Sequence, residues 1–316
     1  MRPYIFIFII YFLLFNCSSH IEDVTKPDDN EEQPRLVSRV GKTSAFELGS
    51  WNIEWFPKDG TKTINYVKTI IKNLDIDLIA VQEIASVSSF NALLDSLGRG
   101  WKGALSNDAY GDGSYQKTGV IYKSAFISLS NVKNIFTRDG YAFPRPPLSA
   151  RVAVKDLRGL QYDFTLIVLH LKAMGGESNE ARRRSACQQL KQYIDTEIAS
   201  GADPDFIVAG DWNDEIDDPA DRNVFQSFLE DTLAYTFLTN SVLSKSSYIS
   251  NTFNSLIDHI LITGDSNSEH RNGYTDVLYL DDEFIKYRSG VSDHRPVVTR
   301  FNGFTIELQT PPAADN

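Results

Sequence analysis

The stretch DFIVAGDWNDEIDD, residues 205–218, indicates a buried strand that ends in charge. Its apolar run, Phe206 to Ala209, is followed almost at once by Asp211 and Asn213. Buried strands seldom end in carboxylates unless something at that end uses the charge. Asp211 and Asn213 are two residues apart, so in an extended chain they lie on the same side. Both are therefore candidate site residues.

The other residues of the stretch have simpler interpretations. Gly210 is expected to let the chain turn at the end of the strand. Trp212 points to the opposite side and is expected to pack in the core. The later acids are expected to be solvated loop residues: Asp214, Glu215, Asp217 and Asp218.

Strands and helices alternate outward from this stretch. The predicted strands cover residues 46–56, 77–84, 118–123, 148–154, 162–173, 205–213, 257–263 and 296–301. The predicted helices cover residues 64–74 and 90–97, with a third that Ser178 caps and that runs to about Ile198. Because no linker interrupts residues 40–303, we expect one α/β domain there, with a frayed tail over residues 304–316.

The composition is that of a globular protein, with 42% hydrophobic and 23% charged residues in 316. The formal net charge is −11. Such a charge opposes the approach of a polyanion unless a local basic patch or a metal offsets it. It excludes a tight non-specific nucleic-acid binder, but not an enzyme that acts on nucleic acid and releases it.

The N-terminus is typical of an exported protein. The apolar stretch Tyr4 to Phe15 is shorter than the roughly 20 residues that span a bilayer, and it suits the core of a signal peptide. LFNC, residues 14–17, resembles a bacterial lipobox. We expect a signal peptide over residues 1–16, a lipid on Cys17 that anchors the protein to a membrane (periplasmic or cell surface), and a disordered acidic tether over 17–39. The alternative is plain secretion, with Cys17 incidental.

Polar residues at the ends of the apolar segments form one set: Asn52, Glu83, His170, Asp211, Asn213, Asp258, Asp293 and His294. Each alone has an ordinary explanation as a loop, turn or core residue. Together they offer hard oxygen ligands and two imidazoles, with no sulfur. That chemistry suits Mg²⁺, with Mn²⁺ or Ca²⁺ possible, and a phosphate ester. A histidine held by a carboxylate can take a proton from water.

These residues lie in motifs that resemble a known family. WNIEWF, VQEI, LHLKA, GDWND, IDHILI and SDHRPVV occur in the order of the endonuclease/exonuclease/phosphatase superfamily, over about residues 46–301. The resemblance implies a deoxyribonuclease I-like fold, a four-layer α/β sandwich of two packed mixed β-sheets flanked by helices.

The resemblance also implies a role for each residue. Glu83 is similar to the principal metal ligand, with Asn52 in support and Asp293 as a further metal residue. Asp258 and His294 resemble the pair that serves as general base. The other implied catalytic residues are Asp211 and Asn213, which orient the water and contact the phosphate, and His170, which protonates the leaving group or binds the phosphate.

Three basic features remain open in the sequence. Arg145 resembles an arginine that contacts substrate, and Arg151 competes for that role. Lys117 stands where relatives carry a glutamate that orients the histidine, so His170 lacks its expected partner. The run Arg182–Arg184 either touches phosphates or, as we expect, forms the solvated face of its helix.

The sequence therefore predicts a monomeric, divalent-metal-dependent phosphodiesterase, foremost a nuclease that cleaves DNA or RNA outside the cytoplasm. Endo and exo cleavage are not distinguished. The main alternative is a phospholipid or sugar-phosphate phosphoesterase. The chain lacks a long apolar insertion for membrane contact, although YLDDEFIKYRSG, residues 279–290, is rich in aromatic residues. A protein that only binds is a lesser alternative, because the set of polar residues is intact.

Overall fold

The computed structural model describes residues 36–253 and 255–307. The predicted signal peptide, Cys17 and nearly all of the predicted tether lie outside these residues. Within them, no helix has the length and apolar character that crossing a bilayer requires.

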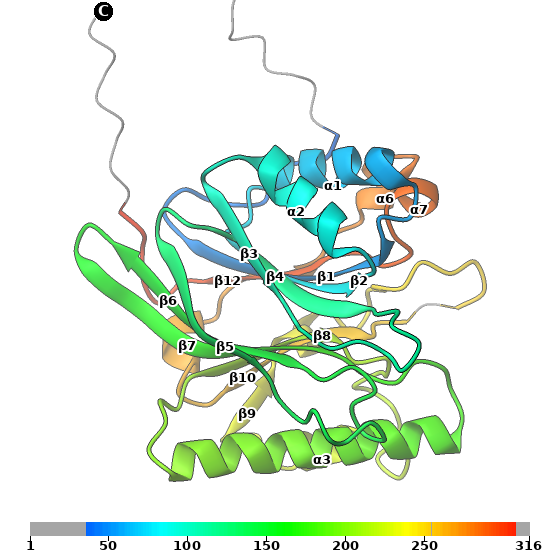
Figure 1. Ribbon diagram of the computed structural model, residues 1–316. Coiled ribbons are helices and arrows are strands. Elements are labelled where there is room, and N and C mark those ends of the chain that lie inside the picture. Colours follow the sequence, from blue (N-terminus) through cyan, green and yellow to red (C-terminus); the bar gives the residue numbers. More distant parts are fainter. Residues whose placement is uncertain (1–35, 254, 308–316) are drawn as a thin grey trace, which may run out of the picture. The chain divides into compact units, whose positions relative to one another are not determined.

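Two six-stranded mixed sheets form the centre of the domain (Figure 1). The first has the order β11-β12-β1-β2-β4-β3, with β1 (Phe46–Phe56), β2 (Leu78–Ile84), β3 (Trp101–Leu105), β4 (Lys117–Lys123), β11 (Thr275–Val277) and β12 (Val297–Phe301). The second has the order β5-β6-β7-β8-β10-β9, with β5 (Ile127–Asn134), β6 (Leu148–Asp156), β7 (Gly159–His170), β8 (Phe206–Asp211), β9 (Tyr235–Phe237) and β10 (Asp258–Thr263).

Helices cover the outer face of each sheet (Figure 1). Helices α1 (Gly60–Leu74) and α2 (Val87–Leu97) lie over the first sheet, and the long α3 (Glu177–Ala199) lies over the second. The remaining helices are single turns: α4 (Gln226–Leu229), η1 (Leu238–Val242), α5 (Asn267–His270), α6 (Leu280–Glu283) and α7 (Tyr287–Gly290). The predicted four-layer α/β sandwich is confirmed.

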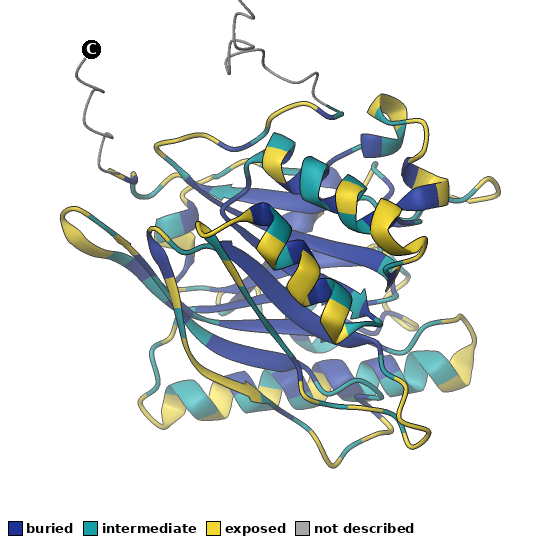
Figure 2. Cartoon of the chain, turned by 45° about the horizontal axis from the view of Figure 1, so that its top comes forward, coloured by how far each residue is buried: buried dark blue, intermediate teal, exposed yellow. Residues whose placement is uncertain are grey.

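Each sheet is apolar on both faces, which is why the central strands appear as continuous apolar runs in the sequence. One core cluster lies between the sheets and includes Leu48, Val168 and Ile260. Two more clusters lie under the helices. Figure 2 shows the central strands buried and the outer helix faces exposed.

The helix boundaries follow from local chemistry. In α1, Val67, Ile70 and Leu74 face the core, and Asp75 ends the helix in a left-handed conformation with φ 59°. Ser86 caps α2 by accepting a hydrogen bond from Ser89 N. The predicted cap of α3 is wrong: Gly176 is the N-cap, and Ser178 lies inside the first turn.

The edge strands were not predicted. In β5, only Ile127 is buried, and the rest of the strand is exposed or half-exposed. Strands β9 and β11 have only three residues each. Periodicity in the sequence cannot reveal strands this short or this polar, because an edge strand is held by backbone hydrogen bonds rather than by burial.

The folded part extends past both predicted ends, 40 and 303. Val37 is buried, and Leu36 N donates to Asn73 Oδ1 at 2.8 Å. At the other end, Phe304 stacks on Phe46, and Ile306 is buried with its N–H bonded to Ser44 O. These short segments have little periodic pattern, and tertiary contacts alone hold them in place.

Candidate active site

Three site residues come from neighbouring strands of the second sheet. The parallel pairing of β7 and β8 sets His170 opposite Asp211, and the antiparallel pairing of β8 and β10 sets Asp211 opposite Asp258. Residues directly opposite each other in a sheet project to the same face. The register therefore brings together an imidazole and two carboxylates that are far apart in the sequence.

The first sheet contributes Asn52 and Glu83 from its central strands. β1 and β2 run parallel, and their register shifts after Asn52. At this irregularity Glu83 adopts φ 62°, and its Oε2 accepts a hydrogen bond from Trp55 N at 3.0 Å. A positive φ on a non-glycine residue is uncommon and is often found where a site needs it. Here it re-aims the Glu83 carboxylate at the end of the sheet.

His294 comes from the loop before β12 and forms a tight pair with Asp258. His294 Nδ1 lies 2.8 Å from Asp258 Oδ2, and both residues are buried. The loop is fixed on two sides: Ser292 Oγ donates to Asn52 O at 2.7 Å, and Tyr287 Oη donates to His294 O at 2.5 Å. With Nδ1 bonded to the carboxylate, Nε2 is the free nitrogen of the ring. It lies 3.9 Å from Asp211 Oδ2.

Asn52 lies between the two sheets' carboxylates. Its Nδ2 donates to Glu83 Oε1 at 3.1 Å and to Asp211 Oδ2 at 3.0 Å. His170 Nε2 lies 3.8 Å and 3.4 Å from the same two oxygens. Asn52 Oδ1 accepts from Glu54 N. In this arrangement Asn52 bridges two acids and does not present its oxygen to them.

Burial acts in opposite directions on the pKa values of Asp211 and His294. Burial, followed by the charge of Asp258, raises the pKa of Asp211. Burial alone would lower the pKa of His294, but the charges of Asp258 and Asp211 raise it to about 10. Nearby negative charge raises both pKa values, whereas burial raises only that of Asp211.

His170 is held neutral. Burial, with the nearby charges of Arg145 and His294, lowers the pKa of His170 well below its usual value. Its Nδ1 is buried and has no hydrogen-bond partner among the described residues. As expected from the sequence, Lys117 offers none: its ammonium donates to Asp108 O instead. The tautomer that avoids a buried unpaired donor carries its proton on Nε2, facing Glu83 and Asp211.

These residues lie in or under a cleft of about 700 Å³. The predicted site residues that line it are Glu83, Arg145, His170, Asp211, Asn213, Asp293 and His294. Asn52 and Asp258 are fully buried beneath it. Gln116 Oε1 accepts from Arg145 Nη2 at 2.6 Å and from Arg145 Nε at 3.1 Å, which fixes the guanidinium at the cleft wall.

Arg151 does not belong to this cleft. It lies on β6 and forms ion pairs with Asp163 and Asp203, beside the C-terminal end of α3. Alternation along the strand explains this placement. Val152 and Val154 face the space between the sheets, and Arg151 therefore faces the opposite way. Of the two arginines Arg145 and Arg151, Arg145 alone lines the cleft.

The local geometry after β8 differs from the expected extended segment. Gly210 lies within the strand, and a Cβ there would meet Leu169 O at 2.1 Å, so close approach of β7 rather than a turn requires glycine. Asn213 has φ 57°, and its N–H bonds to Asp211 Oδ1 at 2.9 Å. Both side chains still reach the cleft, through a turn that the carboxylate itself stabilises. Trp212 is fully buried, as predicted.

Two residues expected to be solvated are buried together. Arg183 Nε donates to Asp214 Oδ2 at 2.7 Å, and the side chains are 3% and 8% exposed. Arg183 Nη1 also donates to the carbonyls of Lys172 and Met174. The pair therefore pins the loop between β7 and α3 along the cleft. The sequence alone does not reveal such a pair, because in a run of charged helix residues nothing shows which side chain faces inward.

Sequence reasoning missed further cleft residues, among them Trp55, Gln116, Tyr248 and Phe253. Gln116 precedes β4, and Trp55 lies near the end of β1. Tyr248 and Phe253 lie in a loop with no periodic pattern, so only the fold brings them to the site. The aromatic segment 279–290 has a different role: Tyr287 is fully buried, and its hydroxyl accepts from Trp51 Nε1 at 2.8 Å.

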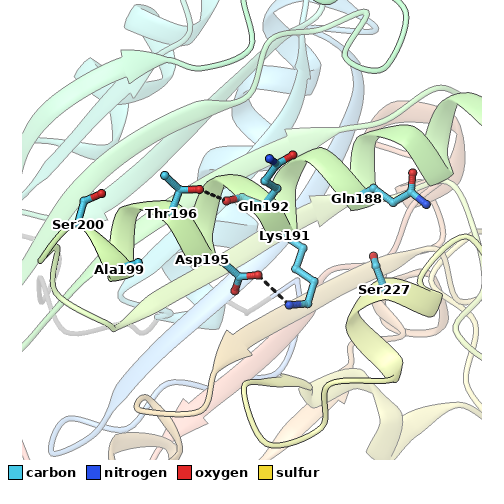
Figure 3. Close-up of a pocket in the computed structure, with 8 residues that line it drawn as sticks. All are labelled: Gln188, Lys191, Gln192, Asp195, Thr196, Ala199, Ser200 and Ser227. Carbon is cyan, nitrogen blue, oxygen red and sulfur yellow. Dashed lines mark hydrogen bonds and ion pairs between the residues drawn. The ribbon is translucent and has the colours of Figure 1, made fainter.

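A second hollow lies on the outer side of α3, and its lining offers little chemistry (Figure 3). Its charged groups, Lys191 and Asp195, pair with each other at 2.8 Å, and Thr196 Oγ1 donates to Gln192 O. These are ordinary contacts one turn apart on a helix. The cleft described above is therefore the candidate active site.

The cleft residues fit a divalent cation. Ligand atoms of Asp211, Asp258 and His294 lie within 4.8 Å of one another, and all three residues are buried. Asp258 Oδ1 has no hydrogen-bond partner within the described chain. None of Glu83, Asp211 and Asp258 forms an ion pair with lysine or arginine in that part of the chain. Hard carboxylate oxygens with uncompensated charge are consistent with divalent metal binding.

Comparison with solved structures finds several proteins of the same fold. The human Nocturnin catalytic domain with bound sulfate is 20% identical (TM-score 0.58; 85% of this chain and 99% of that chain covered). A 3′ phosphatase, NExo, from Neisseria with a product DNA hairpin is 16% identical (TM-score 0.59; 82% and 100%). A mannosyl-6-phosphatase from Bacteroides thetaiotaomicron is 14% identical (TM-score 0.57; 80% and 98%).

At these identities the structural matches establish the fold alone. No curated protein matches the chain. The family model for the Endonuclease/Exonuclease/phosphatase family matches residues 49–294, which include every candidate site residue. The chain therefore belongs to the Endonuclease/Exonuclease/phosphatase family of phosphoesterases.

Proposed function

We propose that this protein is a divalent-metal-dependent phosphodiesterase that cleaves nucleic acid. The observation that carries the proposal is the pair His294 Nδ1–Asp258 Oδ2, at 2.8 Å, with the free Nε2 of His294 directed to the acid-lined cleft. This is the arrangement of a general base held by a carboxylate.

His294 takes the proton of the attacking water at Nε2. Asp258 accepts the Nδ1–H bond, which fixes the ring orientation and stabilises the imidazolium that forms. Tyr287 and Ser292 hold the loop that carries the base. Asp211 lies 3.9 Å from Nε2 and orients the water between the base and the phosphate.

The opposite wall of the cleft binds the phosphate. His170, kept neutral by burial, donates its Nε2–H to a phosphate oxygen rather than releasing the proton. Asn213 supplies an amide donor from the turn after β8. Arg145 places a guanidinium at the cleft wall, where two bonds to Gln116 orient it. These groups face the cleft from three segments of the second sheet.

Glu83 and Asp211, whose carboxylates both contact Asn52 Nδ2, would hold the cation, with Asp293 at the rim. Asn52 would join them as a ligand only with its amide turned, because its nitrogen now faces both acids. The cation, when bound, neutralises charge on the phosphate and leaving oxygens, and it lowers the pKa of His294 by offsetting the charge of the acids. Mg²⁺ is the first candidate, with Mn²⁺ or Ca²⁺ as alternatives.

Aromatic side chains around the cleft favour a nucleic acid over other phosphate esters, because every nucleobase offers a face for stacking. Sugar phosphates are the second candidate. The supporting observation is the likeness in fold to a mannosyl-6-phosphatase, which at 14% identity speaks to the fold alone.

The test is a substrate panel with Mg²⁺, Mn²⁺ or EDTA that compares single-stranded DNA, duplex DNA, RNA, sphingomyelin and a sugar phosphate. We expect metal-dependent cleavage of nucleic acid that EDTA abolishes. His294→Gln should lower kcat by about 10²–10⁴-fold. His270→Gln, at a buried histidine outside the cleft, is the matched control and should keep wild-type kcat once folding is verified. Hydrolysis of only the lipid or the sugar phosphate would refute the nuclease proposal.

Export and the lipid on Cys17 stay predictions from the sequence. Incorporation of labelled palmitate into the wild type, and its loss in Cys17→Ser, would test them. Equal labelling of both proteins would contradict the anchor.

A further inference from the structure

Three aromatic side chains line the cleft beside the candidate catalytic residues, and we call them the aromatic rim: Trp55, Tyr248 and Phe253. Trp55 and Phe253 are each 55% exposed. Such large rings are usually buried, because each exposes a wide apolar face to water. Their position at the cleft mouth suggests that a ligand covers those faces.

Trp55 is coupled to the candidate metal residue Glu83. Its backbone has φ 49°, and the preceding Glu54 has φ 31°. Two successive non-glycine residues with positive φ make a costly turn. The turn is stabilised in part by the bond from Trp55 N to Glu83 Oε2 at 3.0 Å. The position of the Trp55 indole therefore depends on the position of the Glu83 carboxylate.

On the other side, Tyr248 and Phe253 form a platform that begins at the candidate base. The ring of Tyr248 meets His294 edge-on, with centroids 5.2 Å apart and an interplanar angle of 68°. Phe253 stacks over Tyr248 at 5.9 Å and 20°. Tyr248 also forms a backbone bridge with His294, and Ile249 N bonds to Asp293 O at 2.7 Å. The platform is thus fixed relative to the catalytic imidazole.

The charge around the rim does not attract a polyanion. The acidic residues that line the cleft are Glu54, Glu83, Glu180, Asp211, Asp214, Glu215 and Asp293, against Arg145 and Arg183. Arg183 is already paired with Asp214, which leaves one arginine for the substrate. Capture of a nucleic acid through many phosphate contacts therefore has no basis here. Affinity must come from uncharged contacts, and the rim supplies them.

We infer that the aromatic rim stacks unpaired nucleobases, so that the enzyme acts on single-stranded nucleic acid in preference to duplex. This inference rests on the proposed nuclease function. Stacking on an aromatic side chain accepts any base, because every base has a π-face. In a duplex those faces are covered by neighbouring base pairs, and they become available only in single strands, loops or frayed ends.

A lipid fits the rim less well than a base. Acyl chains need a wide contiguous apolar surface, whereas the rim offers only three rings, two of them stacked on each other. Glu54 adjoins Trp55 in the chain, and Asp293 lines the cleft as well. A nucleobase suits this surface because it has a flat apolar face for the rings and a polar edge that tolerates the nearby carboxylates.

The experiment compares two single-stranded oligomers of equal length and charge with Mg²⁺: oligothymidylate, and a polymer of abasic residues that has the same phosphates without bases. The wild type should cleave oligothymidylate with a kcat/KM about tenfold to a hundredfold higher, the range expected for stacking one base. Trp55→Ala and Phe253→Ala should each reduce that ratio, mainly through KM. Each variant should lose more activity on oligothymidylate than on the abasic polymer, which offers the ring no base to stack.

The matched control is Tyr141→Ala. Tyr141 is also 55% exposed, but it packs against Arg182 and does not line the cleft. It should leave the ratio unchanged. Trp55→Phe, which keeps a ring at the rim, should restore most of the ratio that Trp55→Ala loses. The salt dependence of KM for oligothymidylate should be weak, because few phosphates are neutralised.

Three outcomes would overturn the inference, and they can be told apart. If the wild type cleaves both oligomers and the rim variants keep its ratio, stacking is excluded and the nuclease function stands. If the wild type cleaves neither oligomer but hydrolyses sphingomyelin vesicles, and Trp55→Ala lowers that rate, both the nuclease function and the base-stacking role fail together. Equal rates on both oligomers by the wild type would also exclude stacking.

Discussion

An acid cluster lies near each end of β1 and β2, and the two clusters are built differently. At the start of these strands, Glu47, Asp75 and Asp77 meet Arg39, Lys123 and Arg300; we call this the paired network. At the other end, Glu83, Asp211 and Asp258 form the catalytic cluster. None of these three forms an ion pair with lysine or arginine among the described residues.

Hydrogen-bond counts do not distinguish the two clusters. Glu47 Oε2 in the paired network and Asp258 Oδ1 in the catalytic cluster are both buried without a partner in the described residues. Charge balance does distinguish them: the paired network holds three acids against three lysine or arginine cations, whereas the catalytic cluster holds three acids against the single imidazolium of His294. Buried carboxylates that have cation partners stabilise a fold, whereas buried carboxylates without them cost free energy until a cation binds. The comparison teaches that an unbalanced acid cluster indicates a function, while a balanced one indicates structure.

The largest expected effect separates catalysis from stability. Asp258→Asn should lower kcat by about 10²–10⁴-fold, because it removes the group that orients and stabilises His294. It should change the free energy of unfolding without metal only slightly, because the loss of the ion pair with His294 is offset by the removal of one excess buried carboxylate. Glu47→Gln, in the paired network, should do the reverse: it should lower stability and spare kcat. Steady-state kinetics and urea unfolding of both variants test this contrast, and a large loss of kcat in Glu47→Gln would break it.

Arg300→Ala should destabilise the fold by about 3–5 kcal/mol, the usual cost of leaving a buried carboxylate unpaired. Arg300 Nε lies 2.7 Å from Glu47 Oε1, and the Glu47 side chain is fully buried. Arg300→Lys keeps the charge and should lose less. Urea unfolding gives the free energies, and kcat per folded molecule should stay at the wild-type value. A loss below about 1 kcal/mol for Arg300→Ala would mean that the paired network contributes little.

The smallest effect depends on pH. Burial and Asp258 raise the pKa of Asp211 from 3.8 to about 7. A raised folded-state pKa means that the folded protein binds the proton more tightly than the unfolded chain. The resulting stability is present below pH 3.8 and is lost as the pH rises through about 7. Without metal at pH 7.5, Asp211→Asn should therefore be more stable than the wild type, by roughly 1–3 kcal/mol.

Thermal unfolding from pH 4 to pH 8, with EDTA and with Mg²⁺, measures that difference. The advantage of Asp211→Asn should vanish near pH 4. Mg²⁺ should stabilise the wild type more than the variant, because only the native site with its full charge binds the cation tightly. An advantage that is the same at every pH would show that charge in the catalytic cluster is not the cause.

Most of the central fold was predictable because burial leaves a periodic trace. Strands such as β2 and β8, buried on both faces, appear as unbroken apolar runs, and α1 shows its inward face at helical spacing. The edge strands leave no such trace. The short terminal segments around Val37 and Ile306 also escaped prediction, because neither has a repeating pattern and each is held by contacts with distant residues.

The residues of the candidate site show the same contrast between positions that local sequence predicts and positions that it does not. The eight polar residues that the sequence singled out at the ends of apolar segments all reach the cleft or its floor, because strand ends meet at one edge of a sheet. Side chains on helices and loops were misplaced where burial decides their role. Arg183 and Asp214, expected in solvent, form a buried pair, and Arg151 turned away from the cleft.

The sequence by itself determined the α/β class, the central strands and the residue types that gather at their ends, since these depend on local periodicity and on motif order. Only the tertiary structure decided which acids are balanced by cations, which arginine faces the cleft, and that Trp55 and Phe253 stand beside the catalytic cluster. The physical reason is that charge balance and exposure belong to pairs of residues far apart in the chain. Asp211 and Asp258 share one register position across two strands, 47 residues apart, and nothing local in either segment records that meeting.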